Sequence, residues 1–255
     1  MKPINNTLFL GKVLIELDDS PSTNMYAHEL LSKNRPIEGT AIIAHNQYQG
    51  KGQYGKKWIS ESGKNLTLSV ILYPDFLKIE DQFYLNKLVC IALVEFLASL
   101  GVESKIKWPN DIYHENLKLG GVLIENSVSL QYLSSSILGI GLNINQLEFD
   151  SELTNPISVA TVLGKELDLE MCVNNFLAAL EKWYLILKNG DYQMLDSGFN
   201  KNLYRAGESI LVDLQGKTHE AIFTGVERTG KIKLEIDDHI DSYTNHEIEI
   251  HWLKS

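Results

Sequence analysis

The residues best suited to chemistry form a short basic segment, QYQGKGQYGKKW, at residues 47–58. Its glycines let the backbone take positive φ angles and approach a ligand closely. Successive free N–H groups in such a loop form an anion-binding concavity, and the lysines add positive charge. The segment predicts a loop that binds phosphate or carboxylate, although a solvated hairpin with a chance lysine cluster has the same composition. The residues concerned are Gly50, Gly52, Gly55, Lys51, Lys56 and Lys57.

This loop differs from two common nucleotide-binding loops. The pattern G-x-x-x-x-G-K-[ST] is absent. The glycines do fit G-x-G-x-x-G, but the KKWISESGKNL that follows has no helical apolar stripe, so no helix opens after them. Phosphate binding therefore remains possible, and dinucleotide binding is not expected.

A second candidate cluster is KWPNDIYHENLKLGGVLIEN, at residues 107–126. Its Pro-Asn-Asp run is typical of a turn. Asp111 either stabilises that turn or binds Mg²⁺. Lys118 begins an apolar strand and either points to water or meets a carboxylate beside the next two glycines. Both alternatives stay open for each residue.

The histidines and cysteines suggest no metal site. His246 and His251 lie in the alternating segment HEIEIHW, and an offset of five places them on opposite faces of a strand. Cys90 falls in an apolar helical pattern, and with Cys172 it forms no disulfide framework or zinc spacing. This cysteine usage is typical of a reducing cytoplasm, which we predict as the location.

The bulk composition excludes some classes of protein. A net charge of -10 and a pI of about 5.2 disfavour a protein whose main partner is bulk nucleic acid. No stretch of about 18 uninterrupted apolar residues exists, and the N-terminus lacks the pattern of a signal peptide, so no membrane association is expected.

Helices and strands in no strict alternation are expected to position these residues, so the α+β class is predicted. Apolar residues recur every three or four positions from Leu85 to Leu100 and from about Glu170 to Lys188. Ser20 is expected to cap a first helix that has Pro21 at its first position. Expected strands cover residues 12–17, 40–44, 65–73, 104–108, 118–125 and one or two within 131–145, with a turn at 109–116.

The sequence pattern changes after about residue 200. Short alternating segments separated by glycine turns predict a small antiparallel barrel. We therefore predict a main domain at residues 1–197 and a small β-barrel domain at 198–255. The segment QYLSSSILGIG is a candidate edge strand for pairing in a homodimer.

Four stretches, in this order and spacing, resemble the biotin–protein ligase family. They are PSTN (21–24), the loop 47–58, KWPNDIY…KLGGVLIE (107–125) and GIGLNIN (139–145). The resemblance implies a catalytic domain with a mixed sheet packed with helices, similar to class II synthetases, followed by an SH3-like barrel. It also implies that ATP and Mg²⁺ activate biotin to biotinyl-5′-AMP, and that biotin then passes to a lysine of a biotin carboxyl carrier protein.

The resemblance implies a role for individual residues. Lys118 and Lys51 would be catalytic, and Asp111 would bind Mg²⁺. Biotin would be contacted by Ser22, Thr23, Asn24, Gln47, Gly50, Lys51, Gly52, Gln53, Lys118 and Gly121. The nucleotide would be contacted by Lys51, Gln53, Lys56, Trp58, Asn65, Asn110 and Asn143.

The loop departs from the family pattern, in which arginines stand where this chain has Lys51, Gln53 and Lys56. Lysine keeps the charge but loses the bidentate fork of arginine, and glutamine loses the charge. We therefore expect Lys51 and Lys118 to carry the main cationic role. With its glycines, the loop is expected to be mobile without ligand and to close over the intermediate.

Some family members carry an N-terminal helix-turn-helix that represses transcription. Only twenty residues precede PSTN here, which predicts a ligase that does not bind DNA. A lipoate ligase or octanoyl transferase of the same superfamily is one alternative. A non-catalytic biotin or nucleotide sensor is another.

Overall fold

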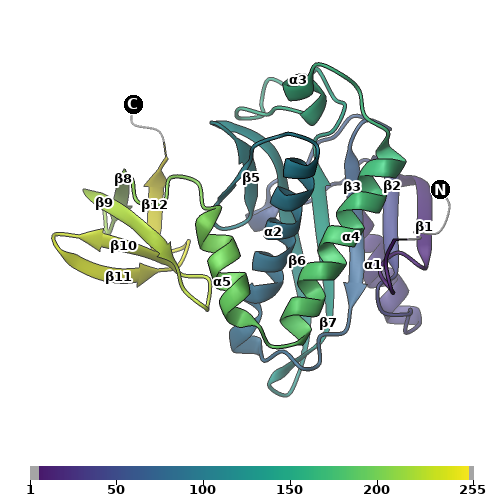
Figure 1. The fold of residues 1–255 in the computed structure, drawn as a ribbon, viewed down its shortest axis with the longest axis horizontal. Coiled ribbons are helices and arrows are strands. Elements are labelled where there is room, and N and C mark those ends of the chain that lie inside the picture. The colour runs from purple at the N-terminus through teal and green to yellow at the C-terminus, as the bar shows by residue number, and fades with distance from the viewer. Residues whose placement is uncertain (1–5, 253–255) are drawn as a thin grey trace.

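In the computed structural model, which describes residues 6–252, the chain forms a large mixed sheet covered by helices and a smaller sheet beside it (Figure 1). The large sheet has the strand order β1-β2-β3-β7-β6-β5-β4. β1 and β2 run parallel, and every other neighbouring pair is antiparallel. The bounds are β1 (Leu14–Ser20), β2 (Ala41–Gln47), β3 (Leu66–Leu72), β4 (Lys105–Lys107), β5 (Asp111–His114), β6 (Leu117–Ser129) and β7 (Tyr132–Leu142).

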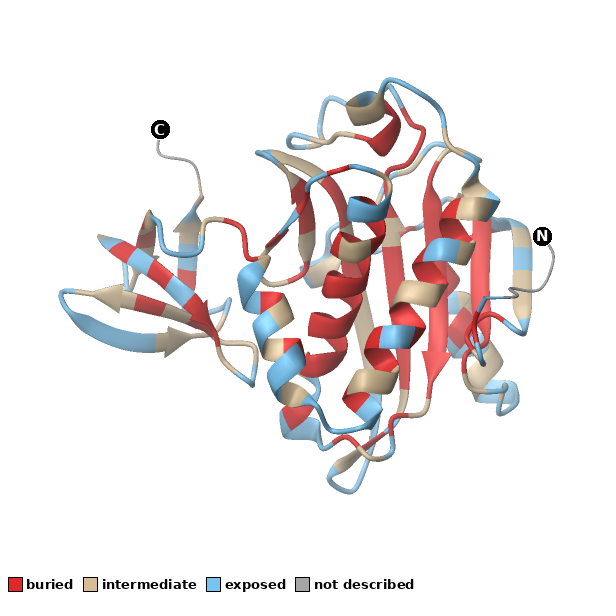
Figure 2. Ribbon diagram, viewed as in Figure 1, coloured by how far each residue is buried: buried red, intermediate tan, exposed pale blue. Residues whose placement is uncertain are grey.

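Helices cover the two faces of this sheet unequally. α2 (Phe83–Ser99) and α4 (Leu169–Lys188) lie on one face, where they meet alternate residues of the central strands in the main core (Figures 1 and 2). α1 (Thr23–Lys33) lies on the other face, over a small cluster made by Ala27, Ile42, Ile71 and Ile137. Because side chains alternate along a strand, Gly139 and Gly141 share the α1 face with Ile137. This part of the face beyond the small cluster holds the cavity described below.

The apolar helix in the middle of the core was expected from the sequence. Ile79–Ser99, which joins the short helix η2 (Ile79–Asp81) to α2, is long and apolar enough to cross a membrane by length and composition alone. However, 72% of its apolar window is buried inside the fold. Such burial is typical of the core helix of a globular protein.

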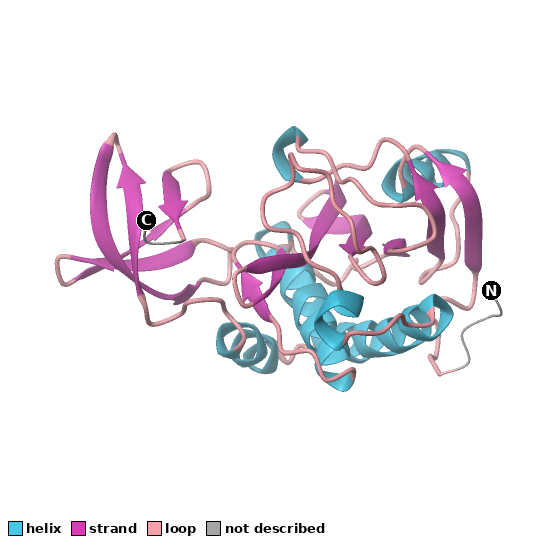
Figure 3. Ribbon diagram, turned by 90° about the horizontal axis from the view of Figure 1, so that it is seen from above, coloured by secondary structure: helices cyan, strands magenta, loops and turns pink. Residues whose placement is uncertain are grey.

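The small sheet follows α5 (Tyr192–Lys201) and has the order β11-β10-β9-β8-β12, with all pairs antiparallel. It stands apart from the helices in a view turned by 90° (Figure 3). The predicted mixed sheet with a small barrel after it is confirmed. The predicted boundary after residue 197 falls inside α5, and the division into domains stays a prediction. The bounds are β8 (Ser209–Leu214), β9 (Lys217–Val226), β10 (Ile232–Ile236), β11 (His239–Tyr243) and β12 (Ile248–His251).

The start of the first helix differs from the prediction. Ser20 is the last residue of β1 and pairs with Gln47, so it remains extended and does not cap a helix. The N-cap is Ser22, in an extended conformation with φ -164° and ψ 140°. The pairing of β1 with β2 therefore outweighs the local Ser-Pro signal.

Two expectations about strands were also wrong. Residues 111–114 form β5 rather than part of a turn, because they pair with β4 on one side and β6 on the other. Residues 132–142 form a single strand, β7, as one of the two expected alternatives, but β7 lies between β3 and β6 and is therefore not the edge strand expected for pairing in a homodimer. A homodimer, which stays a prediction, would need another surface.

Candidate functional site

A cavity of about 610 Å³ lies above the open part of the α1 face. The start of α1, the loop 47–58 and the β5–β6 region surround it. Of the residues predicted from the sequence, all line the cavity except Gly50 and Asn65. Those that line it are Ser22, Thr23, Asn24, Gln47, Lys51, Gly52, Gln53, Lys56, Trp58, Asn110, Asp111, Lys118, Gly121 and Asn143.

The floor of the cavity is made of glycines in register. Gly139 and Gly141 lie on the same face of β7, and Gly121 pairs with Gly141 from β6. A Cβ atom at Gly139 would lie 2.9 Å from Cγ of Asn24, and one at Gly141 would lie 2.7 Å from Cζ2 of Trp58. The floor needs glycine because these two side chains rest directly on it.

One wall is formed by the start of α1 and the end of β2. Ser22, Thr23 and Asn24 are buried, although they are polar. The Thr23 backbone N–H donates to Oε1 of Gln47 at 3.0 Å. This wall therefore consists of neutral side chains that can both donate and accept hydrogen bonds.

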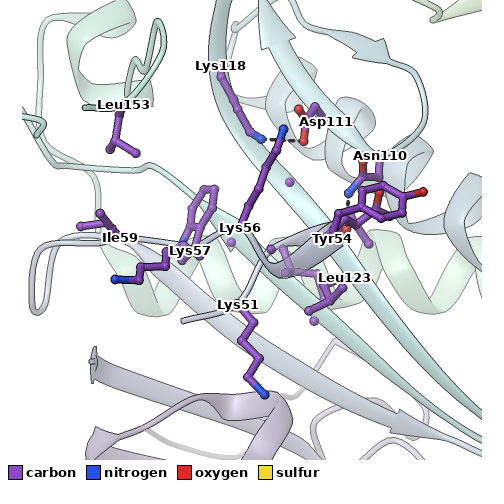
Figure 4. A pocket seen from close by; sticks show the side chains of 18 of the residues that line it. Lys51, Tyr54, Lys56, Lys57, Ile59, Asn110, Asp111, Lys118, Leu123 and Leu153 are labelled. Carbon is purple, nitrogen blue, oxygen red and sulfur yellow. Dashed lines mark hydrogen bonds and ion pairs between the residues drawn. The ribbon is translucent and has the colours of Figure 1, made fainter. Parts of the chain in front are cut away.

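The loop 47–58 folds back on itself. The N–H of Gly52 donates to the Lys56 carbonyl at 2.7 Å, and the N–H of Trp58 donates to the Gly50 carbonyl at 2.9 Å. The lysines of the loop are exposed. Figure 4 shows Lys56 extending toward Asp111 and Lys118, whereas Lys51 extends away from that pair. The loop is thus a hairpin with exposed lysines that also forms the rim of a cavity.

Trp58 connects the loop to the floor. Its indole lies over Gly141, and its Nε1 atom is buried without a hydrogen-bond partner within residues 6–252. A buried N–H without a partner is costly, so this donor suits a site that is completed by a ligand or by loop movement. Gly50 supports the same geometry, since a Cβ there would lie 2.6 Å from Nε2 of Gln47.

Opposite the neutral wall, Lys118 and Asp111 form an ion pair. Nζ of Lys118 lies 2.7 Å from Oδ1 of Asp111, and the two side chains are 30% and 26% exposed. Of the two alternatives for Lys118, the structure supports the one in which its ammonium points into the cavity. Asp111 begins β5, and its carboxylate faces Lys118 rather than closing a turn.

Two more lysines, Lys56 and Lys107, lie near this pair. Lys107 was not among the site residues predicted from the sequence. Lys107 lies 3.1 Å from the hydroxyl of Tyr113 and 4.4 Å from the centre of its ring. Burial lowers the pKa of Lys107, Asp111 opposes this, and the charges of Lys118 and Lys56 lower it further. The signal in the sequence that could have indicated Lys107 is its position directly before the Trp-Pro-Asn-Asp motif. At this end of the cavity, Lys118, Lys107 and Lys56 lie around the carboxylate of Asp111.

The three asparagines predicted to contact the nucleotide, Asn65, Asn110 and Asn143, mainly form hydrogen bonds with backbone groups. Nδ2 of Asn110 donates to the Val122 carbonyl at 2.5 Å, and Nδ2 of Asn143 donates to that of Ile157 at 3.1 Å. Oδ1 of Asn65 accepts from the N–H of Ile144 at 3.0 Å, outside the cavity lining. These contacts fix the strands around the site.

The C-terminal part of the chain also reaches the cavity, which the sequence did not predict. Asn245 and Trp252 line it. The Trp108 indole, also in the lining, donates to the carbonyl of Gly230 at 2.9 Å. Tyr54 of the glycine-rich loop packs edge-on against His246, with ring centres 5.1 Å apart. The small sheet therefore supports the turn that precedes Asp111.

Within residues 6–252 no group of three or more His, Cys, Asp or Glu side chains can hold a metal ion. His246 lies in the turn before β12, and His251 bonds to Asp213 at 2.9 Å. A single carboxylate such as that of Asp111 can still contribute to a Mg²⁺ site, because Mg²⁺ commonly binds one or two carboxylates together with substrate phosphates.

The sequence is similar to those of curated proteins that are named as ligases. A curated relative, the bifunctional ligase/repressor BirA of Bacillus subtilis (strain 168), is 29% identical over 248 residues, covering 96% of this chain and 76% of the relative. The biotin–[acetyl-CoA-carboxylase] ligase of Paracoccus denitrificans is 25% identical over 206 residues, covering 78% of this chain and 85% of the relative.

The fold is also similar to that of a solved structure. The structure of the biotin protein ligase from Aquifex aeolicus in complex with biotin and ATP superposes with a TM-score of 0.79 at 24% identity, covering 94% of this chain and 99% of that one. The family model described as "Biotin/lipoate A/B protein ligase family" matches residues 14–143, which include the cavity floor, the basic loop and the Asp111–Lys118 pair. The chain therefore belongs to the biotin/lipoate A/B protein ligase family.

Proposed function

We propose that this protein is an ATP-dependent biotin–protein ligase. The observation that carries the proposal is one cavity with two unlike ends: the neutral wall of Thr23 and Gln47, and the cations around Asp111. A ureido head group needs donors and acceptors, whereas a carboxylate that must meet a triphosphate needs positive charge. The names of the relatives support biotin as the acid.

In the first step, a biotin carboxylate oxygen attacks the α-phosphorus of ATP. The new acyl O–P bond replaces the bond to the β-phosphate, and pyrophosphate leaves. Lys118 would hold the carboxylate against the phosphate, and Lys51 and Lys56 would close over it from the loop. Holding two anions in attack geometry and neutralising the developing charge are the main contributions available to such a site.

In the second step, the amine of a carrier lysine attacks the acyl carbon of the adenylate. The C–N bond forms, the C–O bond to AMP breaks, and the amine loses a proton. The acceptor in this proposal is a biotin carboxyl carrier protein. The open side of the cavity, beside the exposed loop lysines, is where that amine would enter.

Asp111 is the residue that would hold Mg²⁺. When bound with the nucleotide, Mg²⁺ supplies charge neutralisation at the phosphates. The ion pair between Lys118 and Asp111 would weaken as the anionic substrates enter, because the ammonium would then interact with their negative charges as well.

The proposal covers ligase activity without repression. Its support is the net charge of -10, which opposes DNA binding. A cytoplasmic location is proposed on the two cysteines, Cys90 and Cys172, which are both free and buried. Burial raises the pKa of both thiols, so neither is suited to act as a nucleophile.

Intact mass spectrometry of a carrier domain tests the function. The full chain is incubated with ATP, Mg²⁺, the carrier and either biotin or lipoate. The expected result is one biotinyl group on the carrier and no lipoyl group, with no addition to a carrier whose acceptor lysine is replaced by arginine. A lipoyl addition, or an unmodified carrier with biotin, contradicts the proposal.

A further inference from the structure

Behind the neutral wall, four side chains form a chain of short hydrogen bonds. Nδ2 of Asn24 lies 2.6 Å from Oε2 of Glu125, and Oδ1 of Asn24 lies 2.6 Å from the hydroxyl of Ser69. That hydroxyl lies 2.7 Å from the hydroxyl of Thr23. Asn24, Ser69 and Thr23 are 4%, 0% and 4% exposed. Ser69 and Glu125 lie outside the lining of the cavity.

The direction of each hydrogen bond follows from the carboxylate at one end. An ionised carboxylate only accepts, so Asn24 must turn its amide nitrogen toward Glu125. Its oxygen then faces Ser69 and also only accepts, so the single Ser69 proton is committed to Asn24. The Thr23 hydroxyl has two acceptors within reach, the Ser69 hydroxyl at 2.7 Å and Oε1 of Gln47 at 3.3 Å. Because Ser69 has no second proton with which to close the shorter contact, the Thr23 proton goes to Ser69. The chain runs Thr23 to Ser69 to Asn24 to Glu125, with one orientation.

This direction decides what the wall offers a ligand. With its proton committed, the Thr23 hydroxyl presents only lone pairs to the cavity. The backbone N–H of Thr23 holds Oε1 of Gln47 at 3.0 Å, so the donor side of that amide, Nε2, is turned away from Thr23. The wall then has an acceptor and a donor side by side, which suits a ligand whose N–H adjoins a C=O.

The floor glycine supports the same arrangement. Gly139 pairs with Ser69 across β3 and β7. A Cβ at position 139 would lie 2.9 Å from both Cγ and Nδ2 of Asn24. The carboxamide is therefore held by contact with the floor as well as by hydrogen bonds at both ends.

We propose that Glu125 and Ser69 are positioning residues which, through Asn24, fix the Thr23 hydroxyl as a hydrogen-bond acceptor and so select an acid with a ureido N–H. This inference rests on the proposed function. According to this inference, residues that do not touch the ligand help to exclude acids whose head group has no N–H, such as a dithiolane.

The test measures binding with calorimetry, using biotin and its two cyclic carbamate analogues, in which one ureido N–H is replaced by oxygen. The wild-type protein is expected to prefer biotin over one of these isosteres. Ser69→Ala is expected to weaken biotin binding roughly five- to tenfold, the value of one hydrogen bond, and to reduce that preference by a similar factor. Ser136→Ala is the matched control, because Ser136 is also buried in the sheet and its hydroxyl has no partner within residues 6–252.

Glu125→Gln and Glu125→Ala keep the inference testable if Ser69→Ala does not fold. Glutamine can still accept from Asn24, so it should keep more of the preference for biotin than alanine does, while the KM for ATP stays unchanged in both. Wild-type preference in folded Ser69→Ala or Glu125→Ala overturns this inference alone. Failure of the wild-type protein to bind biotin overturns the proposed function, and this inference with it.

Discussion

The two ends of the cavity are built differently. At the neutral wall, buried polar side chains are held by hydrogen bonds to one another, and Asn24 is held at both ends of its carboxamide. At the cationic end, the loop lysines are exposed, and the Lys118–Asp111 pair is partly open to solvent. One end is fixed before a ligand arrives, whereas the other has charges that can still move.

This difference suits the two tasks. Selecting a neutral head group requires hydrogen-bonding groups of fixed direction, because a mismatched buried donor or acceptor is costly. Meeting a phosphate requires charge, which acts at a distance and tolerates movement. The fixed side chains of the neutral wall are therefore expected to determine which acid binds. Closure of the loop at the cationic end is expected to determine the rate of adenylate formation.

The largest effect is expected at the cationic end. Lys118→Ala should abolish biotin-dependent ATP–pyrophosphate exchange, because it removes the ammonium proposed to hold the carboxylate and leaves Asp111 without its partner. Lys64→Ala, which removes a lysine paired with Glu166 on the surface at 3.0 Å, should leave exchange unchanged. Near-normal exchange by folded Lys118→Ala would show that this lysine has another role.

At the neutral wall, Gly139→Ala should weaken biotin binding by roughly one to two orders of magnitude, because the new methyl displaces Asn24 and leaves buried polar groups unpaired. Calorimetry with biotin measures this effect. Gly198→Ala is a control within α5, where the new Cβ lies no closer than 3.4 Å to its neighbours. Unchanged biotin affinity in folded Gly139→Ala would mean that the wall is less rigid than its contacts indicate.

Within the loop, Lys51→Ala should reduce the exchange rate more than Gln53→Ala does, about tenfold against about twofold, because a neutral amide makes weaker contacts with phosphate than an ammonium does. Lys51 extends away from Asp111 in this structure, so the prediction requires the loop to move. The reverse order of the two effects would show that the loop approaches the phosphate differently.

The smallest effect concerns the loop itself. Trypsin should cleave after the loop lysines more slowly when biotin and ATP are present, because closure protects the backbone. Cleavage after Lys165, an exposed lysine outside the cavity lining, should not change. Equal loop cleavage with and without ligand would argue against closure.

The sequence predicted α1, α2, α4 and most strands of the large sheet because their signals are local, whereas α3 (Val159–Leu163) and α5 were not predicted. The stripe from Leu85 to Leu100 became α2, and the stripe from Glu170 to Lys188 became α4. The prediction failed where distant strands decided the outcome. Residues 111–114 became strand β5 through pairing on both sides, and the pairing of Ser20 with Gln47 replaced a helix cap.

The candidate site shows the same limit. Lys118, Asp111 and the loop lie in short motifs, so the sequence indicated them. Ser69 lies in an apolar strand that gives no sign of a site, and Glu125, although it ends the stretch 107–125, received no role from the sequence. They meet Asn24 across 45 and 101 residues of chain. Their role follows only from the geometry of the donors and acceptors.

The most direct test of the account is ATP–pyrophosphate exchange by the wild-type protein without any carrier, because exchange reports adenylate formation alone. The account predicts exchange that depends on biotin and Mg²⁺ and is not supported by lipoate. Exchange with lipoate, or none with biotin, would contradict it.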